Sequence, residues 1–143
     1  LHTDDGAAVS AMEEGLMPLT QTAMVLLSQV AYHDYEGVAL DLDERERLIK
    51  DIGDKKILIL RNHGTLAAGE SVSSCFMLMY LLERSCTMQV RAMSSNKLRL
   101  PSQQAITTAS NQGNRLIESE GLHKLAWPAL LRMLDRTDVG YRE

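Results

Sequence analysis

The chain has 143 residues, of which 45% are hydrophobic and 24% are charged, and its formal net charge is −4 at pH 7. This length and composition are typical of one globular domain with a sizeable core. The positive residues form no block, which argues against a nucleic-acid-binding face. The apolar runs are much shorter than the ~20 residues needed to cross a bilayer, so we expect neither nucleic-acid nor membrane partners.

The first residues and the cysteines bear on location. Residues 1–5 lack the basic start and the apolar stretch of a secretory signal peptide. Cys75 and Cys86 would lie ~16 Å apart along a helix, which is too far for a disulfide within that helix. Both are therefore expected to be buried thiols in a reducing compartment, and we predict a cytoplasmic protein.

The first part of the chain predicts short helices followed by a strand. Residues 6–14 are small and favour a helix, and Gly15 is expected to stop it. Residues 16–19 contain a proline and are expected to be extended. A second short helix is assigned to residues 20–30, although this assignment is ambiguous, because residues 30–35 alternate loosely like a strand.

The middle of the chain predicts a helix and a β-hairpin. The helix covers residues 43–51, has an acidic first turn and ends before Gly53. The apolar run at residues 56–61 predicts a buried strand. Residues 65–68 are expected to form its hairpin partner, because only a short polar loop separates the two segments.

The C-terminal half is predicted to be helical. Residues 70–93 form the longest helix, with an apolar stripe wide enough to pack on more than one side. A polar helix follows over residues 101–120, and a last helix over residues 129–134 is opened by Pro128, which a first turn tolerates. Residues 138–143 are expected to be irregular. Strands followed by a run of helices predict a layered α/β domain, not a bundle.

Two histidines, His2 and His63, carry the strongest functional signal. His63 lies between Asn62 and Gly64 at the end of the buried strand, and His2 lies in a polar cluster that ends in Gly6. Imidazole is the commonest protein ligand for metal ions such as zinc. A catalytic zinc site usually takes three protein ligands and leaves one position open, so His2 and His63 would supply two of the three.

The third ligand would come from outside this pair. If His2 ends a strand, the residue just before Leu1 would point the same way, because residues i and i+2 share a face. The plainer interpretation is that an isolated histidine at a strand end makes only structural hydrogen bonds. We assign His33 and His123 to that structural class, with Asp34 as a possible partner of His33. The sequence has no G-x-S-x-G nucleophile motif.

Five segments together resemble the class II aldolase/adducin family, in particular its bacterial, adducin-like branch. They are HTDDGAAVSAM at 2–12, GLMPLTQ at 15–21, YHDYEG at 32–37, LRNHGTL at 60–66 and WPALLRMLDR at 127–136. The resemblance covers essentially the whole chain, in order. It implies a three-layer α/β/α sandwich around a largely antiparallel sheet.

The resemblance also implies a domain organisation. Residues 1–143 would form a single class II aldolase/adducin-like domain that lacks its N-terminal portion. Its sheet core and packing helices would occupy residues 1–100, and its C-terminal helices residues 101–143. The chain would then correspond to about the C-terminal two thirds of a family domain. Processing of a mature protein and loss of an N-terminal part both stay open as reasons for its first residue.

The function implied by the resemblance is that of a divalent-metal-dependent lyase. Family enzymes cleave or decarboxylate small hydroxylated carbonyl substrates through an enediolate that a divalent metal, usually zinc, stabilises as a Lewis acid. His2 matches the second histidine of the family's H-x-H pair, and His63 matches the later histidine in its N-H-G context. The first histidine and the acid/base carboxylate would precede Leu1. Active members also borrow a tyrosine from a neighbouring subunit, for which three candidates stay open: Tyr32, Tyr35 and Tyr141.

Three interpretations compete at this point. The chain is a metal-dependent lyase acting on a small-molecule substrate, a non-catalytic adducin-like scaffold for protein–protein contacts, or a metal-binding domain without turnover. The retained His2 and His63 favour the lyase, whereas fold alone does not decide between them. Zinc is the expected metal, although two imidazoles also suit manganese, cobalt or iron. By resemblance, and from the surplus of apolar positions in residues 70–93, we expect a homo-oligomer, specifically a tetramer.

Overall fold

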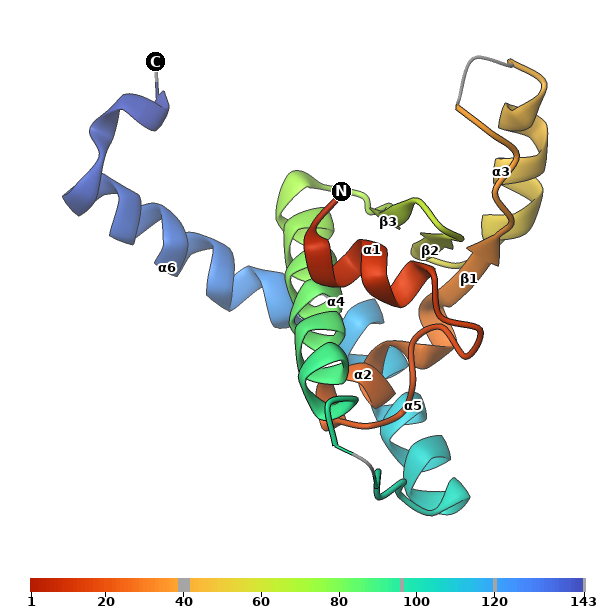
Figure 1. Ribbon diagram of the computed structural model, residues 1–143. Coiled ribbons are helices and arrows are strands. Elements are labelled where there is room, and N and C mark those ends of the chain that lie inside the picture. The colour runs from red at the N-terminus through yellow and green to blue at the C-terminus, as the bar shows by residue number, and fades with distance from the viewer. Residues whose placement is uncertain (39–41, 96, 120, 143) are drawn as a thin grey trace.

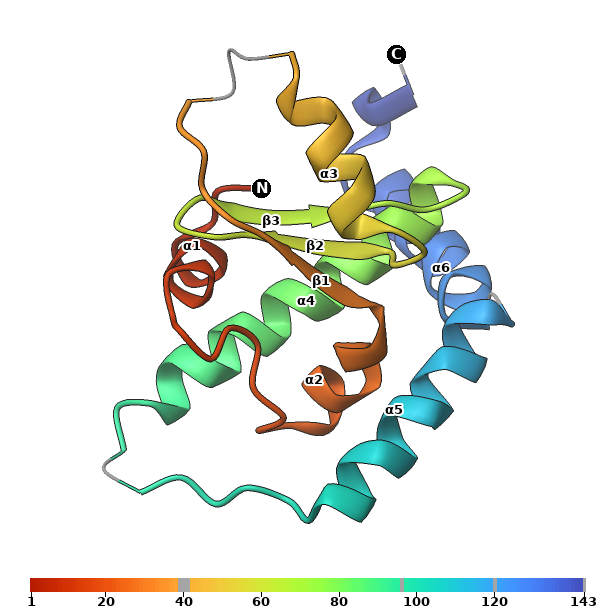
Figure 2. The same cartoon turned by 90° about the vertical axis from the view of Figure 1, so that its right-hand side faces the viewer.

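The computed structural model describes residues 1–38, 42–95, 97–119 and 121–142. Its elements form three layers, in which a small sheet separates one helix from a group of helices. Helix α3 (Glu44–Ile52) covers one face of the sheet. The other face is covered by α1 (Asp4–Ser10), α2 (Gln21–Leu26) and α4 (Val72–Ala92), as Figure 2 shows. The α/β class predicted from the sequence is thus confirmed.

The sheet contains strands β1 (Val30–His33), β2 (Ile57–Leu60) and β3 (Gly64–Ala67), in that order. β1 pairs with β2 in parallel, and β2 pairs with β3 in an antiparallel hairpin. Over the described strands the sheet is therefore mixed, which refines the expected largely antiparallel arrangement. The reason is that α3 follows β1 in the chain and returns it to the end of the sheet at which β1 began. β2 therefore runs in the same direction as β1.

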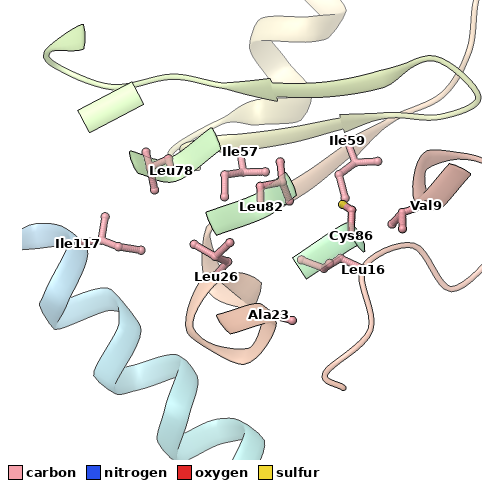
Figure 3. Close-up of a cluster of buried hydrophobic side chains, with 10 residues drawn as sticks. All are labelled: Val9, Leu16, Ala23, Leu26, Ile57, Ile59, Leu78, Leu82, Cys86 and Ile117. Atoms are coloured by element: carbon pink, nitrogen blue, oxygen red, sulfur yellow. The ribbon is translucent and has the colours of Figure 1, made fainter. Parts of the chain in front are cut away.

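The core lies between the sheet and the helices on the α4 side (Figure 3). Ile57 and Ile59 of β2 point into it, while Leu58 between them is buried on the opposite face. This alternation follows from the two-residue period of a strand buried on both faces. The buried cluster comprises Val9, Leu16, Ala23, Leu26, Ile57, Ile59, Leu78, Leu82, Cys86 and Ile117.

Several predicted helix boundaries were wrong, including that of the second helix, which ends at Leu26 and not at residue 30. Helix α1 ends at Ser10, not at residue 14, and a non-helical segment leads to Gly15. Helix α6 (Gly121–Thr137) begins well before Trp127 and contains Pro128 in its interior. A proline there costs a helix about 3 kcal/mol. The leucine and alanine residues around Pro128 are strong helix formers, which helps α6 to continue through it.

The remaining elements match the expected pattern more closely. A 3₁₀ turn η1 (Leu27–Gln29) joins α2 to β1, and α5 (Gln103–Glu118) begins after Ser102. A second 3₁₀ turn, η2 (Val139–Arg142), replaces the irregular tail that we expected. Figure 1 shows α6 projecting from the body of the molecule. None of the helices in the described part of the chain is long and apolar enough to cross a lipid bilayer.

Candidate metal site

The structure brings His2 and His63 into direct contact, although they are distant in the sequence. Their Nε2 atoms are 2.8 Å apart, and the two rings are stacked with centroids 4.7 Å apart. Two nitrogens at this distance lie within the span of two Zn–N bonds of ~2.0–2.1 Å each. The same distance suits a hydrogen bond between one protonated and one unprotonated ring nitrogen. His2 is exposed and His63 half-buried, so the pair is reachable from solvent.

The β2–β3 hairpin delivers His63 to this position. Leu60 and Gly64 are paired at the end of the hairpin, so the loop consists of Arg61, Asn62 and His63. Asn62 has a φ of +56°, a left-handed conformation that asparagine adopts more readily than most residues. The backbone N–H of Asn62 donates to the Ser10 carbonyl at 3.1 Å, which ties the loop to the end of α1.

The segment before α1 delivers His2. The amino group of Leu1 donates to the Thr65 carbonyl at 2.5 Å, and the Thr65 N–H donates to the Leu1 carbonyl at 3.0 Å. Such an exchange of both backbone bonds defines a hydrogen-bonded antiparallel pair. Leu1 therefore continues the sheet beside β3. Gly64 permits this approach, because a Cβ there would overlap the Leu1 carbonyl oxygen and lie 3.2 Å from His2 Cδ2.

A carboxylate that the sequence analysis did not identify contacts residues next to both histidine segments. Glu83 of α4 accepts a hydrogen bond from Thr65 Oγ1 at 2.7 Å and another from Thr3 Oγ1. Thr3 follows His2 directly, and Thr65 lies two residues beyond His63. One signal was available, because Glu83 is the only acidic residue between positions 72 and 92.

One cavity borders the histidine pair, and a second lies beside the preceding residues of the hairpin loop. One, of about 520 Å³, is mainly apolar and borders His2, and Cys75 and Phe76 contribute to its wall. The other, of about 470 Å³, is polar, and Arg61 and Asn62 of the loop contribute to its wall.

The three candidate tyrosines lie in different surroundings. The Tyr35 ring lies edge-on to His63, with centroids 6.4 Å apart. Tyr32 packs under the Arg61 guanidinium and accepts the Leu16 N–H, and Tyr141 donates to Asp135 in the C-terminal segment. Within one chain, Tyr35 is the candidate in ring contact with the histidine pair.

His33 is buried and belongs to a separate polar cluster. Its Nδ1 lies 2.7 Å from Asp51 Oδ2, and its Nε2 lies 3.5 Å from Glu44 Oε1. Both partners come from α3, so the suggested pairing with Asp34 was wrong. The reason is the crossover, which lays α3 against the end of β1. His33 thus helps to attach α3 to the sheet, in keeping with the structural role expected for it.

The ring nitrogens of His2 and His63 are suitable ligands for a transition metal. Two neutral imidazole nitrogens suit zinc, cobalt, manganese or iron. No group of three or more histidine, cysteine, aspartate or glutamate side chains arranged to hold a metal occurs among the described residues. Among the described residues, His2 and His63 would thus be only part of a ligand set.

Comparisons with known proteins converge on one family. The class II aldolase and adducin N-terminal domain matches residues 1–90. The chain is 48% identical to the "Putative aldolase class 2 protein" of Caulobacter vibrioides, over 100% of the chain and 56% of that protein. It is 38% identical to alpha-adducin of Rattus norvegicus, over 99% of the chain and 20% of that protein. The chain thus spans little more than half of its bacterial relative.

The fold agrees with a solved structure. The aldolase II superfamily protein from Pseudomonas syringae superimposes with a TM-score of 0.91 and is 42% identical. The match covers 99% of the chain and 57% of that structure. This likeness extends over all three layers and both C-terminal helices of the chain.

Proposed function

Because the chain belongs to the class II aldolase and adducin family, we propose that it is part of a divalent-metal-dependent lyase. Its substrate would be a small hydroxylated carbonyl compound, which the enzyme cleaves or decarboxylates at a carbon–carbon bond. The observation that carries this proposal is the 2.8 Å approach of His2 Nε2 and His63 Nε2. A purely structural pair of imidazoles has no need to be reachable from solvent beside a cavity.

His2 and His63 would hold the metal, for which zinc is our first choice. A divalent cation bound there would supply Lewis-acid stabilisation of negative charge on the substrate oxygens. The chain's own contribution is positioning: the hairpin loop fixes His63, and the pairing of Leu1 with Thr65 fixes His2. The apolar wall beside His2 would limit water around the bound substrate.

We also propose that a segment preceding Leu1 completes this site. The Leu1–Thr65 pair is antiparallel, so a preceding segment would run on along β3 as a further strand. The residue just before Leu1 would then share a face with His2 and be able to supply the third ligand. Residues 1–143 would be the larger part of one domain. The encoded residues upstream of Leu1 test this, and a histidine directly before Leu1 is the expected result.

A scaffold function is the alternative, favoured by the identity with alpha-adducin. Metal binding by the intact protein separates the two proposals. After treatment with a chelator, the wild type should bind one Zn²⁺ or Co²⁺ per chain. His63→Ala should lose this binding, and the matched control His123→Ala should keep it.

Two outcomes would contradict the lyase. Absence of stoichiometric metal at neutral pH, with His63→Ala unchanged in stability, would favour the scaffold. Metal binding without turnover across a panel of aldol and decarboxylation substrates would indicate a metal-binding domain with no catalytic role.

A further inference from the structure

Glu83 connects the two segments that carry the histidines. Its Oε1 accepts from Thr65 Oγ1 at 2.7 Å, and its Oε2 accepts from Thr3 Oγ1. Thr65 is buried at the start of β3, and Thr3 precedes α1. Because these two threonines are close in sequence to His63 and His2, one carboxylate on α4 holds both histidine segments.

The neighbourhood of Glu83 is built around this contact. Thr3 Oγ1 also accepts the Gly6 N–H at 3.2 Å, so the same hydroxyl caps α1 while it donates to Glu83. A Cβ on Gly6 would lie 2.6 Å from Thr3 Oγ1 and 2.8 Å from Glu83 Oε1. The glycine that closes the polar cluster of His2 therefore leaves the space that the carboxylate occupies.

We propose that Glu83 is a positioning residue, which sets the spacing of His2 and His63 through Thr3 and Thr65. The predicted effect of Glu83 on metal affinity rests on the proposed function, because it requires that His2 and His63 bind a metal. Its consequence for the spacing of the two rings does not depend on a metal.

A carboxylate suits this role better than its neutral analogue. The two threonine hydroxyls both donate, and an ionised carboxylate offers an acceptor oxygen to each. Hydrogen bonds to a charged acceptor are also the stronger kind. A glutamine at position 83 offers one acceptor oxygen and one donor group, so it can keep only one of the two bonds in their present direction.

The first test is a titration of the intact metal-free protein with Co²⁺ alone. Outer residues that orient metal ligands typically affect affinity by 10–100-fold, so Glu83→Gln should weaken Co²⁺ binding by roughly tenfold. It should also change the visible d–d absorption of the bound ion. Thr65→Val, which keeps the side-chain shape and removes the donor, should produce the same two changes.

A matched control separates positioning from general stability. Thr87 Oγ1 donates to Asp5 Oδ2 at 2.6 Å, which is a second polar link between α4 and α1. Thr87→Val removes that link and should leave the Co²⁺ affinity and spectrum unchanged. Equal losses in Thr87→Val and Glu83→Gln would overturn the proposal, because they would reflect weakened packing of α1 on α4.

The second test needs no metal. The nuclear Overhauser effect between the ring protons of His2 and His63 should be present in the wild type and in Thr87→Val, and reduced in Glu83→Gln. If the wild type binds no Co²⁺, the proposed function fails, and this ring contact alone decides the role of Glu83. If Glu83→Gln keeps both the ring contact and the Co²⁺ affinity, the role of Glu83 fails and the proposed function stands.

Discussion

At the scale of single residues, the contact between the histidine segments depends on the missing side chain of Gly64. A Cβ at this position would overlap the Leu1 carbonyl oxygen, which is backbone and cannot rotate away. The pair of hydrogen bonds between Leu1 and Thr65 would then have to lengthen. His2 would move with Leu1. The close packing of Gly64 against Leu1 therefore also determines the spacing of His2 and His63.

We therefore predict that Gly64→Ala both destabilises the protein and weakens metal binding. Overpacking of a tight contact typically costs about 1–3 kcal/mol, and urea unfolding would measure that loss. The Co²⁺ affinity should fall in the same variant. Gly140→Ala is the control, because its nearest obstacle is the Asp138 side chain at 3.2 Å in the exposed tail. An unchanged unfolding midpoint in Gly64→Ala would contradict the packing described here.

A second residue-scale prediction concerns the thiols. Burial, followed by the negative charges of Glu83 and Asp5, raises the pKa of the Cys86 thiol to about 12. Cys75 is only half-buried. A thiol reagent such as Ellman's should therefore label Cys75 alone at pH 8 in the folded protein, and both cysteines in urea. Labelling of Cys86 in the folded state would contradict its placement.

The raised pKa of Cys86 also predicts that the folded protein loses stability at alkaline pH. The pKa of Cys86 is higher in the folded protein than the usual thiol value of 9.0, so the folded state holds this proton more tightly. The free energy of unfolding should therefore fall as the pH rises from about 9 towards 12. Cys86→Ser should show a shallower decline over this range, although its stability at pH 7 is expected to be lower. Parallel pH profiles of the two proteins would argue against this source of the decline.

At the scale of elements, the sequence predicted what local patterns determine. The hairpin followed from an apolar run and a short polar loop, and α4 from a long apolar stripe. The end of α1 was not predictable in this way, because distant side chains hold the segment that follows it. Gln89 donates to the Gly15 carbonyl at 2.7 Å, and Arg61 donates to the Met12 carbonyl at 2.6 Å.

The same limit applies to the candidate site. The polar clusters around His2 and His63 indicated both residues, because His63 directly precedes Gly64 and the cluster of His2 ends in Gly6. Glu83 has no such local context. Its threonine partners are 80 and 18 residues away along the chain, so only the packing of α4 against the sheet and α1 reveals its role.

The C-terminal elements offer a prediction of their own. Tyr141 donates to Asp135 Oδ1 at 2.6 Å, and Arg142 also donates to this carboxylate. The Tyr141 hydrogen bond, with the bond and charge of Arg142, holds the pKa of Asp135 below its usual value. Because the pKa is lowered, this contact between η2 and α6 should persist at neutral pH and be lost as the pH falls through that lowered value.

We predict that Tyr141→Phe moves the pKa of Asp135 back towards its ordinary range. A titration followed by NMR of the Asp135 carboxyl carbon would measure the shift. Tyr35→Phe, a change of the same kind remote from the tail, should leave the Asp135 titration unaltered. The prediction fails if the two variants titrate alike.

At the scale of the whole molecule, α6 and α4 together leave an apolar surface open. Phe76 and Tyr80 of α4 are 43% and 51% exposed, and Met133 of α6 is 45% exposed. These side chains border a groove of about 540 Å³ between the two helices. Contiguous apolar patches of this kind mark interaction sites in soluble proteins. We therefore predict that this groove is a contact of the homo-oligomer that the sequence led us to expect.

The final prediction is that Met133→Glu weakens self-association. A carboxylate introduced into the groove would have to be buried without a partner when two copies associate, which is costly. Light scattering should show the wild type as a multiple of its chain mass and Met133→Glu shifted towards the single chain. Arg84→Glu is the control, because Arg84 is exposed on α4 but does not border the groove. A wild type that stays monomeric at high concentration would remove this surface from consideration, as would an unchanged assembly in Met133→Glu.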